Sequence, residues 1–229
     1  MAALDIAPIE TPQVSATDRV FDTLYDAVVS VALPPGTKVS EGEIAKQLGV
    51  SRQPVRDAFF RLANLGFIAI RPQRATLITR ISLGKVNDAV FTRTALETEC
   101  LRTAMSNSGK ALLAALQSTL QQQQDAIGAE TARFHTLDER FHEIICDVAG
   151  HAHIWTLIKE QKAHLDRIRF LSLSKERRQI VCDEHQSIVC AIKRDDAGAA
   201  EAALRDHIQG VQAIVERVRA DFPSYFENA

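Results

Sequence analysis

The sequence predicts a mostly α-helical chain in two parts, an N-terminal winged helix-turn-helix followed by an all-α antiparallel bundle of six helices. Two observations predict this. A turn-and-helix motif and a short β-rich segment occupy the first third of the chain, and only long amphipathic stretches follow Ser82. Because no alternating strand pattern interrupts those stretches, they are expected to pack on one another as helices. The expected division is a disordered leader over 1–14, the winged helix over 15–81 and the helical part over 82–229.

Helix and turn signals divide the first part. Ser15 stands three residues before Asp18, the spacing of a capping pair, and an apolar stripe at helical spacing runs on to about Val31. The proline pair within residues 33–37 cannot continue that helix. A short amphipathic helix over 43–48 is expected next.

The segment GVSRQPVR has the features of a tight turn followed by a helix that can enter a DNA groove. Gly49 allows the turn, Ser51 can cap the helix, and Pro54 falls in the first turn, where its missing N–H costs nothing. Arg52 and Arg56 are four residues apart and share one helix face, which can meet phosphates and base edges. With the preceding short helix, this is a helix-turn-helix pattern.

A basic hairpin is expected to follow. Two runs rich in β-branched residues, 67–70 and 75–79, flank its tip. Residues 52–80 contain six arginines and one acidic residue, although the whole chain has a formal net charge of −2. This concentration of positive charge favours DNA binding over the alternative, a three-helix scaffold with a solvated charged face. The residues expected to contact DNA are Ser51, Arg52, Gln53 and Arg56 in the helix, and Arg71 and Arg74 in the hairpin tip.

Length and composition set the broad class of protein. The chain has 229 residues, enough for two modest domains, and no run of about 18 apolar residues suggests a membrane span. The N-terminus has no positive region ahead of an apolar stretch, so the protein is expected to be cytoplasmic. Its four cysteines lack CxxC spacing and are expected to be packed, reduced thiols.

Several polar residues fall on the apolar faces of the expected bundle helices. Asp138 and His142 are four residues apart, so they project from one face. His185 and His207 each lie among apolar residues on separate later helices. One carboxylate and three imidazoles could form a site for zinc, nickel, manganese or iron with open positions. The alternative is that each histidine is a hydrogen-bonded core residue.

Arg93 precedes Glu97 by one helical turn, and two interpretations are open. The two can form an exposed ion pair worth about a few tenths of a kcal/mol. Alternatively, the Arg93 guanidinium can bind an organic acid whose other end is held by a metal. Three further arginines are weaker candidates for this contact and are expected at the surface: Arg169, Arg177 and Arg178.

These motifs resemble those of the GntR family of bacterial transcription regulators, in the FadR-type branch with a helical FCD effector domain. The resemblance covers about residues 17–220 and is strongest in LPPGT, IAKQLGVSR and PVR, with RTALE and the Asp138 and histidine motifs matching in the second half. One departure is Gly42, where the family often has a basic or polar residue, so one phosphate contact is expected to be missing. The resemblance implies a divalent metal ion, preferably zinc, held by Asp138, His142, His185 and His207, with Arg93 contacting a small carboxylate effector.

The predicted function is that of a homodimeric, effector-responsive transcriptional regulator, a repressor that binds a palindromic operator in double-stranded DNA. It is not expected to be an enzyme. A rival interpretation is a metal-dependent enzyme with a DNA-binding tether, which is disfavoured because Glu139 and Glu184 are expected to point away from the metal. A third is an architectural DNA binder whose bundle only dimerises.

Overall fold

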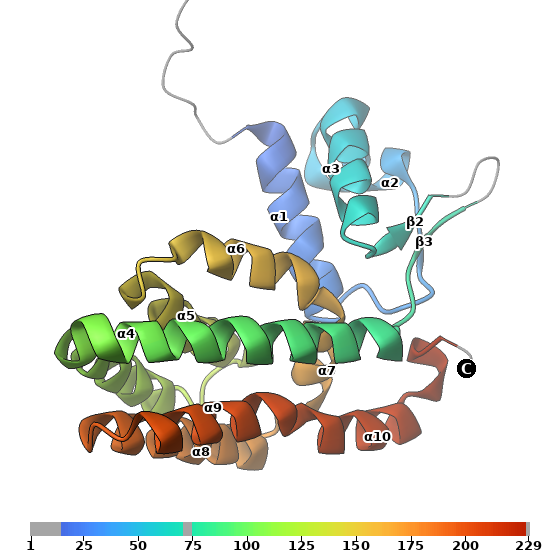
Figure 1. Cartoon of the computed structure of the whole chain (residues 1–229). Coiled ribbons are helices and arrows are strands. Elements are labelled where there is room, and N and C mark those ends of the chain that lie inside the picture. Colours follow the sequence, from blue (N-terminus) through green and yellow to red (C-terminus); the bar gives the residue numbers. More distant parts are fainter. Residues whose placement is uncertain (1–14, 71–74, 228–229) are drawn as a thin grey trace, which may run out of the picture.

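The computed structural model describes residues 15–70 and 75–227, which form two packed units (Figure 1). We refer to residues 16–78 as the N-terminal unit and to residues 83–225 as the helical unit. The N-terminal unit contains α1 (Ala16–Val29), β1 (Lys38–Val39), α2 (Glu41–Leu48), α3 (Arg52–Asn64), β2 (Ile68–Ala69) and β3 (Thr76–Ile78).

Local signals set the helix ends in the N-terminal unit. Ser15 Oγ accepts a hydrogen bond from the backbone N–H of Asp18 at 3.0 Å, which confirms the predicted capping pair. Gly49 ends α2 with a φ of 65°, a left-handed conformation that a residue without a Cβ adopts at little cost. Ser51 holds the N-cap position of α3, but among the described residues its side chain makes no capping bond, so that prediction is wrong.

An antiparallel three-stranded sheet in the order β1-β3-β2 completes the N-terminal unit. The β2–β3 pair is the predicted hairpin, and it pairs Ile68 with Ile78. The hairpin tip, with Arg71 and Arg74, lies outside the described residues. The helices and the sheet enclose one hydrophobic core, which includes Val20, Leu24, Val28, Val55, Phe59, Leu62 and Phe67.

Long helices packed around α4 make up the helical unit (Figure 1). Their apolar faces meet in a second hydrophobic core. The predicted fold class, a winged helix-turn-helix followed by a helical bundle, is confirmed. The elements are α4 (Leu83–Asp125), α5 (Thr131–Val148), α6 (Ala152–Gln161), α7 (Ala163–Ser172), α8 (Lys175–Lys193), α9 (Ala197–Gln209), α10 (Val211–Asp221) and the 3-10 helix η1 (Pro223–Tyr225).

The helical segments differ in number from the six that the sequence predicts. The expected break at 107–109 is a kink at Ser108 within a continuous α4. Two predicted helices are each divided, one at Lys162 into α6 and α7 and the other at Gly210 into α9 and α10. No proline or glycine lies at the break at Lys162, so the sequence carries no local signal for it.

The apolar character of the helices and the state of the cysteines agree with the sequence. Within residues 15–70 and 75–227, no helix has the length and apolar character that crossing a bilayer requires. All four cysteines lie in this described part as free thiols, and Cys100, Cys146 and Cys182 are buried, as expected for packed cysteines.

Contacts made by α7 join the two units. Arg167, which is fully buried, donates from Nη1 to the Thr79 carbonyl oxygen at 2.7 Å. Its Nη2 lies 2.7 Å from His164 Nδ1, which also accepts from the backbone N–H of Ser82 at 3.2 Å. No sequence pattern assigns a role to His164. In the structure it connects α7 to the segment between the two units.

Candidate functional site

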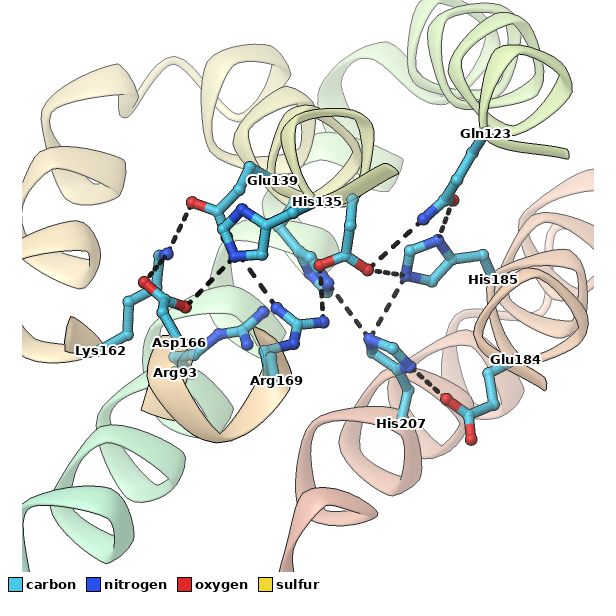
Figure 2. A network of polar contacts seen from close by, with 12 residues as sticks. Arg93, Gln123, His135, Glu139, Lys162, Asp166, Arg169, Glu184, His185 and His207 are labelled. Atoms are coloured by element: carbon cyan, nitrogen blue, oxygen red, sulfur yellow. Dashed lines mark hydrogen bonds and ion pairs between the residues drawn. The ribbon is translucent and has the colours of Figure 1, made fainter. Parts of the chain in front are cut away.

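Four predicted site residues converge inside the helical unit (Figure 2). Asp138 and His142 come from α5, His185 from α8 and His207 from α9, and all four are buried. His207 Nε2 lies 3.2 Å from His142 Nε2 and 3.3 Å from His185 Nε2. His185 Nε2 lies 3.7 Å from Asp138 Oδ1. We call these four residues the histidine cluster.

Each imidazole of the histidine cluster is oriented through its other nitrogen. The Nδ1 atoms face oxygen acceptors: Glu97 Oε2 at 2.7 Å from His142, Gln123 Oε1 at 2.8 Å from His185, and Glu184 Oε2 at 2.7 Å from His207. These contacts assign the proton of each neutral ring to Nδ1, which leaves a lone pair on Nε2. The three Nε2 lone pairs therefore point toward one another.

Burial and nearby charges set protonation within the cluster. Burial lowers the pKa of His185 well below its usual value, and it lowers the pKa of His207 to about 4 although Glu184 opposes the shift. Burial alone would raise the pKa of Asp138. However, Arg169, with Nη2 2.6 Å from Asp138 Oδ2, and the imidazoles hold that pKa well below its usual range. At neutral pH His185 and His207 are therefore neutral imidazoles and Asp138 is a carboxylate, which are the forms that bind metals.

The donor set of the histidine cluster fits a divalent metal ion. Three imidazole nitrogens and one carboxylate oxygen match the ligands preferred by zinc and other first-row metals. An Nδ1 hydrogen bond to a carboxylate or amide oxygen is how proteins orient metal-binding histidines. In the alternative of separate core histidines, the Nε2 contacts at 3.2 and 3.3 Å become hydrogen bonds only if a ring carries its proton on Nε2, which turns a bare Nδ1 toward an oxygen acceptor.

Arg93 is buried beside the cluster, so its interpretation as part of an exposed ion pair is wrong. Only 2% of its surface is exposed, and its Nε donates to Glu97 Oε1 at 2.6 Å. Glu97 in turn contacts His142. Arg93 is therefore linked to the cluster through a carboxylate that it already holds.

The arginines expected at the surface are largely buried, so that expectation is also wrong. Arg178 donates to two backbone carbonyls and so serves packing. Arg169 and Arg177 line a cavity of about 20 Å³ together with Arg93 and His207. That volume holds about one water molecule, so a larger ligand requires side chains to move.

The two glutamates expected to point away from the cluster differ in position. Glu184 contacts His207 Nδ1, so it lies behind this imidazole and outside the space between the Nε2 atoms, as expected (Figure 2). Glu139 lies with its Oε2 2.6 Å from Lys162 Nζ, in a separate group of polar residues.

The four α3 residues expected to contact DNA form an exposed face. They are Ser51, Arg52, Gln53 and Arg56. Arg56 is partly neutralised, because its Nη2 lies 3.0 Å from Glu41 Oε2 of α2. Both side chains are exposed enough for a phosphate to compete with this ion pair.

The guanidinium of Arg52 lies close to α2 at Gly42. A Cβ added at residue 42 would stand 3.5 Å from Arg52 Nη2. Residue 42 lacks the family's usual polar side chain, but the guanidinium of Arg52 lies beside it. Arg52 can supply a cation to a phosphate at this place.

Comparisons with known proteins agree with both units. The family model for "Bacterial regulatory proteins, gntR family" matches residues 16–78, and the FCD domain model matches residues 88–210. The chain is 32% identical over 217 residues to the HTH-type transcriptional repressor RspR of Escherichia coli K12, covering 94% of this chain and 95% of that protein. It is 26% identical to the Nta operon transcriptional regulator of Aminobacter aminovorans, covering 79% and 85% of the two chains.

A solved structure has the same fold. E. coli McbR/YncC superposes with a TM-score of 0.75 at 21% identity, over 90% of this chain and 99% of that one. Fold and relatives together define a bacterial DNA-binding transcriptional regulator and not an enzyme. The chain belongs to the GntR family, in the branch that carries an FCD domain.

Proposed function

We propose that this chain is a metal-loaded repressor that releases or rearranges on its operator when it binds a small organic acid. The observation that carries this proposal is the set of three inward Nε2 atoms beside Asp138, each imidazole held through Nδ1. The repressor name of one relative supports the direction of regulation.

The proposed ligands of the metal are Asp138, His142, His185 and His207. Zinc suits this donor set best, and nickel, manganese or iron(II) are compatible with it. When bound, such an ion would supply an open coordination position for an oxygen of the effector. Glu97, Gln123 and Glu184 orient the imidazoles, and a low pKa keeps Asp138 ionised.

The proposed effector is an organic acid that competes for the arginines of the small cavity. Arg169 there is paired with Asp138 at 2.6 Å, and Arg93 is paired with Glu97. A carboxylate entering the cavity would offer Arg169 a new partner, since guanidinium groups bind carboxylates in two-pronged geometry. We therefore add Arg169 to Arg93 as a proposed effector contact.

The structure suggests how α7 would carry this change to the DNA-binding face. Arg169 lies on the same helix as Arg167, which holds the Thr79 carbonyl of the N-terminal unit. A new partner for Arg169 would favour one arrangement of α7, and therefore one placement of α3. The effector can shift that equilibrium only by binding the two arrangements with different affinity.

We further propose that two copies act together on a palindromic operator. Phe91 of α4 is 76% exposed, and it borders a cleft of about 320 Å³ that Thr94, Arg205 and Gln209 also line. An exposed aromatic ring within a mixed polar surface is typical of an interface. A two-fold dimer would present two α3 helices to two half-sites.

Metal analysis combined with thermal unfolding tests the proposal. The purified protein should contain a divalent metal, and one class of organic acid should raise its melting temperature only while the metal is present. His185→Ala should lose the metal of the histidine cluster and the acid response but keep DNA binding, whereas exposed His153→Ala should change neither metal content nor the acid response. Equal metal content in His185→Ala and wild type, or an acid response that survives chelation, would refute the site.

A further inference from the structure

A second group of ligand atoms lies between α5 and α7, apart from the histidine cluster (Figure 2). It consists of His135 and Glu139 on α5 and Asp166 on α7, which we call the acidic cluster. His135 Nε2 lies 3.8 Å from Asp166 Oδ1 and 3.9 Å from Glu139 Oε1. All three atoms fall within 4.8 Å of one another.

These three atoms are buried, and the described residues offer none of them a hydrogen-bond partner. Asp166 is only 1% exposed, yet its Oδ1 is turned toward His135. An unpartnered buried carboxylate oxygen is costly, because it has lost water without a replacement. A cation bound by all three would satisfy both oxygens and the imidazole nitrogen at once.

Lys162 explains the orientation of the carboxylates and leaves a negative charge to balance. Its Nζ lies 2.6 Å from Glu139 Oε2 and 2.6 Å from Asp166 Oδ2. Each carboxylate therefore uses one oxygen for Lys162 and directs the other toward His135. The two carboxylates outnumber this ammonium group, and the nearby Arg169 is 3.9 Å from Glu139 Oε1 while it holds Asp138 at 2.6 Å.

We propose that the acidic cluster is a second divalent cation site, with His135 Nε2, Glu139 Oε1 and Asp166 Oδ1 as ligands. One imidazole nitrogen and two carboxylate oxygens suit Mn²⁺ or Zn²⁺, with solvent completing the coordination. Ligand distances of about 2.0–2.2 Å require the three atoms to move inward by a few tenths of an ångström. Lys162 bonds to the far oxygens, so it holds the carboxylates in place without occupying the ion's position.

A cleft gives this site access to solvent and brings it next to α1. The cleft is about 560 Å³ in volume and is lined by all three ligand residues and by Tyr25 and Asp26 of α1. Burial and the negative charges of Asp166, Glu139 and Asp26 raise the pKa of Tyr25. An ion joining α5 to α7 would lie where the helical unit meets the N-terminal unit.

Mn²⁺ binding tests the second site independently of the first. In full-length His185→Ala/His207→Ala protein, which lacks two of the four proposed ligands of the histidine cluster, Mn²⁺ titration followed by EPR should give one bound ion per chain. Adding Asp166→Asn or His135→Gln should weaken that binding at least tenfold. Glu143→Gln is the matched control, because Glu143 lines the same cleft outside the ligand set and should leave binding unchanged.

Wild-type protein supplies a second readout that does not depend on the double variant folding. It should bind two ions per chain, and Asp166→Asn or His135→Gln should bind one. Stoichiometry unchanged by both substitutions, or loss equal to that in Glu143→Gln, would overturn the second site. If the wild-type protein bound an ion only at the acidic cluster, the proposed function would be refuted and this inference would stand.

Discussion

Glu184 allows the metal site to be tested through a residue that is not a ligand. Its Oε2 lies 2.7 Å from His207 Nδ1, and Arg177 holds both of its oxygens, at 2.9 and 3.2 Å. Burial opposes ionisation of this carboxyl, but the hydrogen bond from His207 lowers its pKa below the usual value. Glu184 is thus a fixed negative charge that orients one imidazole and increases its basicity.

Substitutions at Glu184 should weaken metal binding in a graded way. Glu184→Gln keeps an oxygen acceptor for His207 but removes the charge, so we expect roughly a tenfold loss of zinc affinity. Glu184→Ala removes both, so the loss should approach roughly 100-fold, or about 2.7 kcal/mol. Glu201→Gln is the control, because Glu201 lies on α9 like His207 but forms an ion pair with Arg102 of α4 and does not contact the cluster.

Competition with a chromophoric chelator measures these affinities at pH 7.5. The expected order is wild type equal to Glu201→Gln, then Glu184→Gln, then Glu184→Ala. Equal zinc affinity in all four proteins would show that His207 is not a ligand held by Glu184. A loss in Glu201→Gln as large as that in Glu184→Ala would indicate general destabilisation instead.

Three further predictions concern DNA binding, assembly and pH. Arg52→Ala or Arg56→Ala should weaken operator binding by about 1–3 kcal/mol in fluorescence anisotropy; unchanged affinity in both would refute the role of the α3 face. Phe91→Glu should convert a dimer into monomers in analytical ultracentrifugation, while a dimer that persists would place the interface elsewhere. Burial and the charges of Arg167 and Lys85 lower the pKa of His164 to about 3, whereas the unfolded chain has a value near 6.5. The unfolded state therefore binds more protons below about pH 6.5, so stability should fall by about 2 kcal/mol between pH 7 and pH 5 from this residue alone. His164→Asn should flatten that part of the pH profile in urea unfolding, and an unaltered slope would contradict the assignment.

The parts of the fold that the sequence could predict are those set by neighbours in the chain. Gly49 permits a left-handed turn and Pro54 restricts the backbone around it in any tertiary context, so one short segment predicts the helix-turn-helix. Apolar residues lie near His185 and His207 at helical spacing, so the sequence predicts that both side chains face inward. Spacing along one helix identifies these side chains as candidates, but it does not predict that they lie close together in space.

The parts that the sequence could not predict depend on contacts between distant segments. Glu184 meets His207 across two helices, and Arg169 meets Asp138 across 31 positions of sequence, so neither pairing has a local signature. A charged residue on a helix is exposed by default, which led to the wrong surface assignment for Arg169. Burial of such a charge becomes evident only when its partner is located.

Operator release measured with and without metal tests whether the organic acid acts through the histidine cluster. Wild-type protein bound to its operator is titrated with the organic acid that stabilises it, and anisotropy of labelled DNA is followed before and after chelation. We predict release at acid concentrations that leave His185→Ala and the chelated protein bound to DNA. Equal release from wild type, His185→Ala and the chelated protein would show that the acid acts without the histidine cluster.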